Sequence, residues 1–575
     1  MTLPIKVIME ILSHNMLVVG GGLTGLRAAI EAKQAGCDVA VLSKVHPLRS
    51  HSVAAQGGIN AALGNAPTPV KDSWENHAFD TIKGSDYLAD QETVEVMCRE
   101  GIERIIEMEH WGTLFSRMED GRIAQRPFGG AGFPRTCYAA DRTGHNLLHV
   151  LYEQVMGLRI PIYEEWYALS LIVENKRCVG VLALDFFKGE IIPIQAKIIL
   201  LATGGYGRIY LRSTNAVINT GSGCYLAYQA GVPLKDMEFV QFHPTSLYGT
   251  NILITEAARG EGGYLINARG ERFMKRYAPN LMELGPRDIV ARGIQTEIDE
   301  DRGFEEGYVH LDLRHLGKDL ILDRLPGIRQ IAIDFAGIDP ILEPVPIQPA
   351  QHYSMGGIAT SVDGETSLPG LYAAGECACV SVHGANRLGG NSLLETIVFG
   401  ARAARRALEN MKREQMEADR KVFQDSSKAL HATLEGIYDR KGEEPSYRLR
   451  DELKTLMSSR VGIFRKEPDL LEAKKRIREL KERLKRINVK QKGLAFNNEL
   501  IQTLELEGMV HLAEVIVEGA LARRESRGSH FRTDYPRRDD DHWLRHTLAY
   551  KTSDGPMLEY QEVTITNYPP KERTY

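Results

Sequence analysis

Residues 16–25, with the sequence MLVVGGGLTG, join an apolar run to glycines in the spacing G-x-G-x-x-G. Residues 26–35 are rich in alanine, and residues 38–42 are again mostly apolar and β-branched. This order predicts a strand, a tight turn, a helix and a second, parallel strand. The free backbone N–H groups at the start of such a helix can hold a pyrophosphate, because glycines let the backbone approach it. The stretch therefore predicts a dinucleotide site whose turn is formed by Gly20, Gly22 and Gly25.

The second predicted strand ends at Ser43 and Lys44, where dinucleotide folds often carry an acidic residue for the ribose. We therefore assign the ribose contact to Ser43, with Lys44 beside it. A later apolar strand runs into a glycine turn at Gly204, and another runs into Gly375 and Glu376. We expect Gly204 and Glu376 to contact the cofactor as well. Several such turns and an inserted domain favour a flavin enzyme over a simple nicotinamide dehydrogenase.

The rest of the chain is predicted to form further domains. Residues 238–349 have strands and turns of their own and a proline-rich exit, which indicates an insertion. Long charge-rich segments with leucine and isoleucine at helical spacing, residues 401–413 and 468–490, indicate a helical domain. We expect an α/β fold with a Rossmann-like FAD-binding domain, an inserted α+β capping domain, a helical domain and a C-terminal α+β tail. The expected boundaries are 1–237 and 350–410 for the FAD-binding domain, 238–349 for the capping domain, 411–530 for the helical domain and 531–575 for the C-terminal domain.

Charged side chains of both signs crowd the C-terminal stretch. Its arginines are Arg523, Arg524, Arg527, Arg532, Arg537 and Arg538, and Asp539–Asp541 follow them. Mixed charge of this kind suits docking better than catalysis. We interpret the stretch as a docking segment.

The composition excludes several classes of protein. The 575 residues include 71 Lys and Arg against 76 Asp and Glu, and no basic block suits a phosphate backbone, so nucleic acid is not an expected partner. The longest apolar stretches, such as residues 191–202, fall short of the ~18 to 20 residues of a membrane-spanning helix. Residues 1–14 lack the pattern of a secretory signal. We expect a cytoplasmic protein whose membrane contact comes from other subunits.

The seven cysteines are scattered without a C-x-x-C pair, whereas iron–sulfur and structural zinc sites usually need clustered thiolates. They are Cys37, Cys98, Cys137, Cys178, Cys224, Cys377 and Cys379. We expect reduced core cysteines and no metal site on this chain. Any iron–sulfur relay must then lie on a different chain.

Residues 49–58, RSHSVAAQGG, resemble the flavin-attachment segment of the succinate dehydrogenase and fumarate reductase flavoproteins. In that family the histidine at the position of His51 is bonded to the 8α carbon of FAD, so the resemblance implies covalent FAD at His51. The resemblance covers nearly the whole chain after residue 15. It continues through residues 137–145, 241–245, 255–263, 287–288, 352–357, 383–392 and 569–575. The further cofactor contacts it implies are Gln56, Gly57, Gly58, Ser222, Ser392 and Leu393.

The resemblance also implies a substrate site. A dicarboxylate needs cationic and hydrogen-bonding partners at both ends, and a guanidinium suits a carboxylate in two-point geometry. Arg287 matches the residue that gives or takes a proton, with Glu256 and Arg259 as its route to solvent. Hydride would move between one substrate carbon and flavin N5 while Arg287 handles the proton at the other. The residues that match the clamp on the two carboxylates are His243, Thr255, His352 and Arg387.

One position departs from the family pattern. Ser222 stands where the family commonly has an acidic residue, and its hydroxyl could still bond the cofactor. The resemblance nevertheless implies the flavoprotein subunit of succinate dehydrogenase, the respiratory complex II of the tricarboxylic acid cycle. Such a subunit oxidises succinate, passes electrons to an iron–sulfur subunit, and lies on the cytoplasmic side of the cell membrane through partner and anchor subunits.

Three other readings compete with this one. A fumarate reductase would run the same reaction in reverse, and Gln56, where some fumarate reductases carry Glu, favours succinate oxidation. An L-aspartate oxidase shares the fold and much of the clamp but lacks the attachment histidine, so His51 argues against it. A flavin electron-transfer or assembly subunit without substrate chemistry would have a degraded clamp, and every clamp residue is present here.

Overall fold

The N-terminal strand, turn and helix are present as predicted in the computed structural model, which describes residues 10–412 and 418–574. Strand β1 (Leu12–Val19) lies between β2 (Val39–Ser43) and β9 (Glu190–Leu201) and is parallel to both. The glycine turn after β1 leads into α1 (Leu23–Gln34). The sheet has seven strands in the order β6-β2-β1-β9-β8-β7, with β16 beside β9. Its other members are β6 (Ile162–Glu164), β7 (Trp166–Glu174), β8 (Arg177–Asp185) and β16 (Leu371–Ala373).

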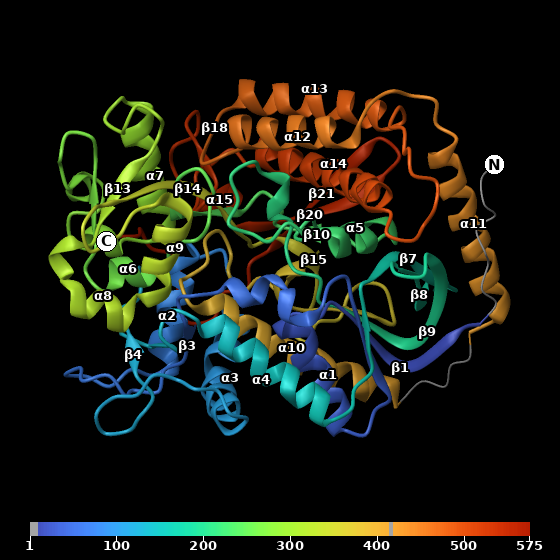
Figure 1. Ribbon diagram of the computed structural model, residues 1–575, viewed down its shortest axis with the longest axis horizontal. Coiled ribbons are helices and arrows are strands. Elements are labelled where there is room, and N and C mark those ends of the chain that lie inside the picture. The colour runs from blue at the N-terminus through green and yellow to red at the C-terminus, as the bar shows by residue number, and fades with distance from the viewer. Residues whose placement is uncertain (1–9, 413–417, 575) are drawn as a thin grey trace.

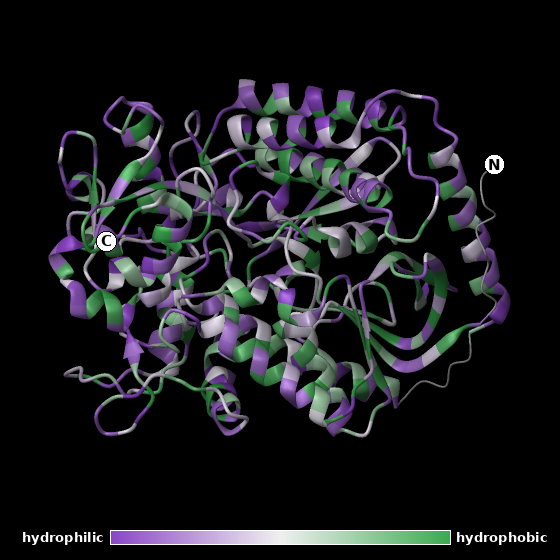
Figure 2. Cartoon of the chain, viewed as in Figure 1, coloured by the Kyte–Doolittle hydropathy of each residue, from purple (hydrophilic) through white to green (hydrophobic). Residues whose placement is uncertain are grey.

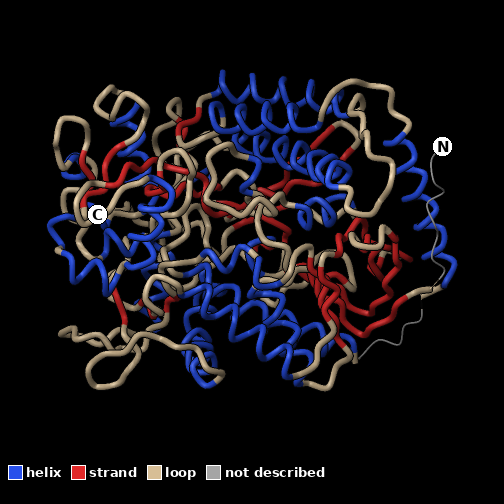
Figure 3. The backbone as a smooth tube through the Cα atoms, in the orientation of Figure 1, coloured by secondary structure: helices blue, strands red, loops and turns tan. Residues whose placement is uncertain are grey.

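Both faces of this sheet are covered, so β2 and the second half of β1 are buried, as is usual for parallel strands. Met16 and Val18 point to one face and pack against helices, while Leu17 and Val19 point to the other. Figure 3 shows the strands of the sheet in red with helices around them. The helices on the first face are α1, α3 (Gln91–His110), α4 (Thr143–Gly157) and α10 (Asn391–Met411), with α2 (Trp74–Gly84) packed on α3.

A second sheet forms the centre of the capping domain, at the left of Figure 1. Its strand order is β11-β14-β13-β12, and every pair is antiparallel. The domain has an apolar core of its own, as an insertion requires. The strands are β11 (Val240–Leu247), β12 (Tyr264–Ile266), β13 (Val309–Asp312) and β14 (Val345–Ser354). The helices are α6 (Glu256–Gly260), α7 (Arg287–Asp299), α8 (Lys318–Arg324) and α9 (Pro326–Ala336).

Three helices of the predicted helical domain pack on one another at the top of Figure 1: α12 (Ser446–Arg460), α13 (Glu467–Leu484) and α14 (Asn498–Ala522). In α13, Leu470, Ile477 and Leu480 are buried along one stripe, whereas Leu471 is 51% exposed. The helix is therefore amphipathic, and it is more hydrophilic than α14 in Figure 2. Helix α11 (Arg420–Tyr438) lies apart from this bundle and packs on β7 and β9 of the FAD-binding sheet.

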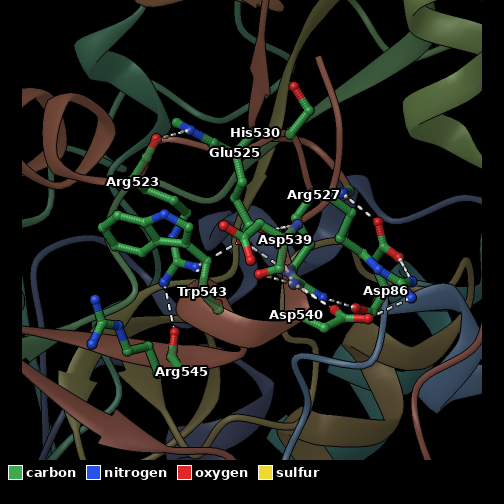
Figure 4. A network of polar contacts seen from close by, with 12 residues as sticks. Asp86, Arg523, Glu525, Arg527, His530, Asp539, Asp540, Trp543 and Arg545 are labelled. Atoms are coloured by element: carbon green, nitrogen blue, oxygen red, sulfur yellow. Dashed lines mark hydrogen bonds and ion pairs between the residues drawn. The ribbon is translucent and has the colours of Figure 1, made fainter. Parts of the chain in front are cut away.

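Of the six arginines in the segment interpreted as a docking segment, Arg524 and Arg537 are exposed, whereas three others are buried. Arg523, Arg527 and Arg532 are almost fully buried, because each has carboxylate partners inside the protein. Glu525 accepts hydrogen bonds from Arg523 at 3.0 Å and from Arg527 at 2.8 Å, and Asp540 pairs with Arg527 at 2.8 Å (Figure 4). Sequence patterning does not distinguish a solvated charge cluster from a buried one, so the burial of these three arginines was not predicted.

This arginine network connects distant parts of the chain. Arg527 also donates to the carbonyl of Asp86, which lies between α2 and α3 (Figure 4). Strands β20 (Arg545–Thr552) and β21 (Gly555–Glu562) extend a sheet of order β17-β15-β10-β20-β21. Its remaining strands are β10 (Leu234–Lys235), β15 (Gly357–Ala359) and β17 (Ala378–Cys379). Within the described ranges, no helix has the length and apolar character needed to cross a membrane.

Candidate active site

One large cavity lies between the FAD-binding sheet and the capping domain, with about 1610 Å³ of space outside the protein atoms, part of it open to solvent. The turn after β1, residues 50–58 and the end of β9 line one part of it. Strands β11 and β14 and the start of α7 line the other part. All the residues predicted from the sequence line this cavity except Gly25 and Arg259. Segments from three regions of the sequence thus meet at one site.

The glycine turn has the geometry that a dinucleotide needs. Gly20 has φ +121°, and a Cβ there would lie 2.1 Å from the carbonyl oxygen of Ala202. Gly25 faces away from the cavity, and its missing side chain lets α1 pack against β1, since a Cβ would lie 1.8 Å from the Gly20 oxygen. Gly22 is the N-cap of α1 and has no side chain to cap the helix. The Leu23 N–H donates to Ser52 Oγ at 3.3 Å, and the start of the helix lines the cavity. The start of a helix in this position is suited to binding an anion.

Ser43, the last residue of β2, and Lys44 also line the cavity. The Ser43 hydroxyl donates to the Val45 carbonyl at 2.5 Å, which leaves its lone pairs as acceptors for a ribose hydroxyl. Lys44 forms an ion pair with Glu505 of α14, and Thr220 also donates to that carboxylate at 3.2 Å. Ser222 lines the cavity at the start of α5 (Ser222–Gln229) and adds no charge. Sequence reasoning missed Glu505, because it lies 461 residues from Lys44.

His51 projects into the cavity from a short 3₁₀ turn, His51–Ala54. Its Nδ1 accepts a hydrogen bond from the Ala216 N–H at 3.2 Å, and Asn215 Nδ2 lies 3.3 Å from Nε2. Burial and the nearby Arg208 guanidinium lower the pKa of His51 to about 4, so the ring is neutral at physiological pH. Nothing in the sequence pointed to Asn215 or Ala216 as its partners.

Several polar atoms in the cavity wall are buried and have no partner within the described chain: Ser50 Oγ, Gln56 Oε1, Thr203 Oγ1 and Asn219 Nδ2. Buried polar groups are normally hydrogen-bonded. Burial also raises the pKa of Glu376 to about 8, so this carboxyl holds a proton that it can donate. A dinucleotide has hydroxyl, carbonyl and ring nitrogen groups that can form hydrogen bonds with these polar atoms. The residues present therefore fit FAD.

Two histidines and a threonine line the other part of the cavity. His243 on β11 and His352 on β14 have ring centroids 4.8 Å apart. Burial, together with neighbouring cations such as Arg287, lowers the pKa of both rings well below the usual 6.5. Thr255 caps α6 by accepting from the Ala257 N–H, so its hydroxyl proton is available. The neutral rings and the hydroxyl are hydrogen-bonding groups for a carboxylate.

A buried chain of charges leads away from this cluster. Arg287, at the first turn of α7, donates from Nε to Glu256 at 2.7 Å. Arg259 Nη2 lies 3.9 Å from the other Glu256 oxygen and donates from Nη1 to the Glu283 carbonyl. Burial raises the pKa of Glu256, but Arg287 and Arg259 more than offset this and lower it, so the carboxylate is ionised. The structure thus joins the three residues that were predicted to handle the proton.

Arg387 lies beside Arg287 at the bottom of the cavity and is 2% exposed. Burial and the positive charge of Arg287 lower its pKa to about 9. Both guanidiniums donate to one oxygen, Gln241 Oε1, at 3.2 Å from Arg287 and 3.0 Å from Arg387. Two neighbouring cations without an equal number of carboxylates favour a dianionic ligand. Gln241 belongs to a segment noted in the sequence, but sequence reasoning gave it no role.

Comparison with known proteins agrees with this geometry. An FAD binding domain model matches residues 15–393, and a fumarate reductase flavoprotein C-terminal model matches residues 450–575. A fumarate reductase flavoprotein subunit of Mycobacterium tuberculosis is 46% identical, with 98% of this chain and 99% of that protein covered. A succinate dehydrogenase flavoprotein subunit of Rickettsia bellii is 44% identical, with 98% of each covered.

The structural comparison gives the same result. An E. coli quinol fumarate reductase chain superimposes with a TM-score of 0.94 at 38% identity, covering 98% of this chain and 99% of that one. Sequence and fold therefore agree over nearly the full length, and the predicted fold class is confirmed. The chain belongs to the succinate dehydrogenase and fumarate reductase flavoprotein family, whose members are FAD-dependent oxidoreductases.

Proposed function

We propose that this chain oxidises succinate to fumarate, carries FAD covalently on His51, and passes two electrons to an iron–sulfur subunit. One observation carries the proposal: a single cavity contains the dinucleotide turn, His51, and a cluster of histidines and arginines suited to a dicarboxylate.

The substrate carboxylates are assigned to two groups of residues. Arg387 binds one carboxylate through its guanidinium, since it has no carboxylate partner of its own among the described residues. His243, His352 and Thr255 hydrogen-bond the other. His352 Nδ1 lies 2.8 Å from the Thr214 hydroxyl, so its ring is held in place from behind. Fixing both ends of a four-carbon chain places its two methylene carbons at defined positions.

Arg287 is assigned the proton. Its guanidinium lines the cavity, and its Nε is bonded to the ionised Glu256. Arg287 passes its Nε proton to the ionised Glu256 as it takes a proton from the substrate carbon, so the guanidinium regains its charge, and Arg259 continues the path beyond the cavity wall. FAD, when bound, supplies the two-electron redox chemistry at the neighbouring carbon. The protein thereby separates proton and electron transfer between two carbons of the same substrate.

The contacts of His51 support covalent attachment. A neutral imidazole has one lone pair, and alkylation at Nε2 leaves that lone pair on Nδ1. Nδ1 is the atom that already accepts the Ala216 N–H. The Ala216 N–H therefore stabilises the ring form that attachment at Nε2 produces, in which the flavin would replace the Asn215 amide as the neighbour of Nε2. The low pKa of about 4 keeps the ring neutral.

Succinate oxidation is the preferred direction because the flavin segment carries Gln56, which lines the cavity where some fumarate reductases carry Glu. Fumarate reduction is the second candidate, since one relative at 46% identity is named a fumarate reductase. Purified enzyme assayed both ways with artificial electron donors and acceptors decides between them. A larger kcat for fumarate reduction would reverse the assignment.

Partner subunits complete the proposal. The relatives are named flavoprotein subunits, and electrons taken from succinate must leave the cavity for another carrier. An iron–sulfur subunit is the proposed acceptor, with membrane anchor subunits behind it and this chain on the cytoplasmic side of the membrane. Copurification of the chain with an iron–sulfur protein from a membrane fraction, and its loss after mild alkaline washing, would support this arrangement.

The first test concerns His51. Acid-denatured protein run on a gel should show flavin fluorescence in the protein band, and His51→Ser should abolish it while bound FAD remains extractable. His46→Ser is a matched control, since His46 lies five residues away and outside the cavity lining, and it should keep the fluorescence. A dark wild-type band would remove covalent attachment, and turnover of L-aspartate by such a protein would favour an aspartate oxidase.

A further inference from the structure

The side chain of Gln241 uses every hydrogen-bonding group it has inside the protein. It lies on β11, two residues before His243, and it is fully buried. Its Nε2 donates to Asn386 Oδ1 at 3.0 Å and to the Arg387 carbonyl at 2.7 Å. Its Oε1 accepts from Arg287 Nη1 at 3.2 Å and from Arg387 Nη2 at 3.0 Å. Two donors and two acceptors match the amide completely.

These contacts fix the orientation of the amide. Asn386 Oδ1 and the Arg387 carbonyl are acceptors, so the amide nitrogen must face them, and a flipped amide would leave four buried groups unpaired. The amide oxygen must then face the guanidiniums. Asn386 is itself held by the carbonyl of Gly84, to which its Nδ2 donates at 3.0 Å. The oxygen between the two arginines is therefore anchored in the FAD-binding domain as well as in the capping domain.

A neutral oxygen between two guanidiniums differs from a carboxylate in one decisive respect. Two cations this close repel each other, and a shared acceptor holds them together. A carboxylate would do so as well, but it would neutralise one positive charge. The amide oxygen leaves both charges in place. Arg387 forms no ion pair within the described chain, and Arg287 forms one with Glu256, so positive charge remains for a ligand.

We propose that Gln241 is a positioning residue that holds Arg287 and Arg387 on one uncharged oxygen, so that their spacing is fixed while their charge remains available to a dianionic substrate. The proposal rests on the proposed assignment of both arginines to the dicarboxylate site. Gln241 would thus have two tasks. Its amide oxygen fixes the geometry of the two arginines, and because this oxygen is uncharged, the arginines keep their attraction for carboxylates.

Two variants separate these tasks. Gln241→Glu keeps an acceptor but adds a negative charge, so the dissociation constant of malonate, a three-carbon dicarboxylate, should rise at least about tenfold. Gln241→Met removes the acceptor at similar volume and adds no charge, so Arg287 loses its fixed position. In Gln241→Met, kcat for succinate should fall at least about tenfold while malonate affinity stays within about threefold of wild type.

Gln348→Glu is the matched control. Gln348 lies on the neighbouring strand β14, is 3% exposed and lies outside the cavity lining, so its variant adds a buried carboxylate to the same sheet. Both measurements use full-length, flavin-loaded protein, with flavin content and thermal midpoint recorded for each variant. A merely structural role would move malonate affinity and kcat together, in parallel with Gln348→Glu.

The outcomes are unambiguous. The proposal is supported if Gln241→Glu binds malonate more weakly and if Gln241→Met loses kcat while its malonate affinity stays near that of wild type. Unchanged malonate affinity in Gln241→Glu, or an equal loss in Gln348→Glu, overturns it. If Gln241→Glu does not retain flavin, Gln241→Met decides alone, and a kcat within threefold of wild type rejects the role. A wild-type protein that neither binds malonate nor oxidises succinate would instead reject the proposed function.

Discussion

Glu256 shows how a buried carboxylate remains charged. It is 1% exposed, and burial alone would favour its protonated form, but Arg287, Arg259 and the Gly129 N–H all stabilise the anion. The ionised form gives Arg287 a proton acceptor inside the protein. The reactivity of this position therefore depends on the balance between two arginines and one carboxylate.

Removal of that carboxylate should stop the reaction. Glu256→Gln is expected to lower kcat at least about 100-fold, because general acid–base groups contribute about 10² to 10⁴ to the rate. Flavin content should not change, since the cofactor wall is intact. Glu300→Gln, which alters an exposed capping-domain glutamate paired with Arg302, should keep wild-type turnover. Steady-state succinate oxidation measures both, and a Glu256→Gln enzyme within tenfold of wild type would contradict the proton path.

His77 links a single residue to the pH dependence of stability. It is fully buried on α2, its Nε2 bonds Asn391 Oδ1 at 2.9 Å, and burial and Arg135 lower its pKa to about 3. The unfolded chain takes up a proton near pH 6.5, whereas the folded chain does not until about pH 3. Stability from this group is therefore present above pH 6.5 and is lost as the pH falls. The loss between pH 7 and 5 is about 2 kcal/mol.

Urea unfolding at both pH values tests this. His77→Gln should lower the free energy of unfolding at pH 7 but should show a pH dependence that is about 2 kcal/mol smaller than that of wild type. His542→Gln alters a histidine whose side chain is 76% exposed, and it should keep the wild-type difference. An unchanged difference in His77→Gln would mean that other groups dominate acid unfolding.

At the residue scale, the sequence predicted the residues that line the cavity but not the residues that hold them in position. His51, Arg287 and Arg387 belong to motifs that can be recognised in the sequence, and the fold brings them into one cavity. Gln241, Ala216 and Glu505 act through contacts with residues more than 45 positions away. Each of these residue types is common in structural roles. Only the tertiary contact distinguishes a residue that positions a cavity-lining side chain from an ordinary polar residue.

Helix α9 is held by a residue of another domain. Asp141, in the FAD-binding domain, accepts from the N–H groups of Gly327 at 2.6 Å and Ile328 at 3.0 Å, in the first turn of α9. A carboxylate in this position satisfies free N–H groups and stabilises the positive end of the helix. The capping domain is thus attached to the FAD-binding domain through the end of a helix.

Loss of this cap should loosen α9. Asp141→Ala is expected to cost about 1 to 2 kcal/mol of local stability, which corresponds to amide exchange roughly 5 to 30 times faster in α9. Asp334→Ala, on the exposed side of the same helix, should leave the exchange unchanged. Hydrogen–deuterium exchange followed by mass spectrometry gives the answer. Equal protection in both variants would show that apolar packing alone attaches the helix.

At the element scale, periodicity predicted element types better than element ends. The apolar strand predicted before Gly204 is the last part of β9, which begins at Glu190. Residues 190–195 pair antiparallel with β8 on one edge, and residues 194–201 pair parallel with β1 on the other edge. Pro193 lies within the antiparallel half, opposite Leu182. A proline is unfavourable inside a central strand, but Pro193 precedes the first residue of β9 that pairs with β1, Ile194, so one edge of the strand is unpaired at the proline.

Across the whole molecule, the buried arginine network joins segments that the sequence separates by hundreds of residues. Glu525 is fully buried between Arg523 and Arg527, and Arg538 reaches the Asp86 carboxylate at 2.8 Å. Arg573, near the C-terminus, pairs with Asp288 at the start of α7. These contacts bring the C-terminal domain, the FAD-binding domain and the capping domain together beside the active site.

The central carboxylate of the network should matter greatly for stability. Glu525→Gln leaves two buried guanidiniums without their shared anion, and breaking a buried pair costs about 3 to 5 kcal/mol. Glu482→Gln removes an exposed partner of Lys485 and should cost at most about 1 kcal/mol. Thermal unfolding of the two flavin-loaded variants compares them. Similar midpoints would mean that water replaces the lost carboxylate.

Composition and motif order predicted several domains around one dinucleotide fold, and the structure and the family comparison agree with that fold class. The burial of Arg523 and Arg527 was not predictable in the same way. Clusters of mixed charge are usually solvated, and nothing in a charge pattern reveals the carboxylates that approach from other parts of the chain. Burial of ions is a property of the assembled molecule.

The division of the cavity along the chain has a consequence for biosynthesis. Its glycine turn begins at Gly20, but Glu376, Ser392 and Leu393 follow the whole capping domain, and β16 joins β9 only after residue 371. Ribosomes add about 5 to 20 residues per second, so roughly 20 to 75 seconds separate the first cofactor contact from the last. A nascent chain therefore has half of a flavin site long before it can close one. Cells short of FAD would accumulate finished chains with an open cavity, which are natural substrates for chaperones and proteases.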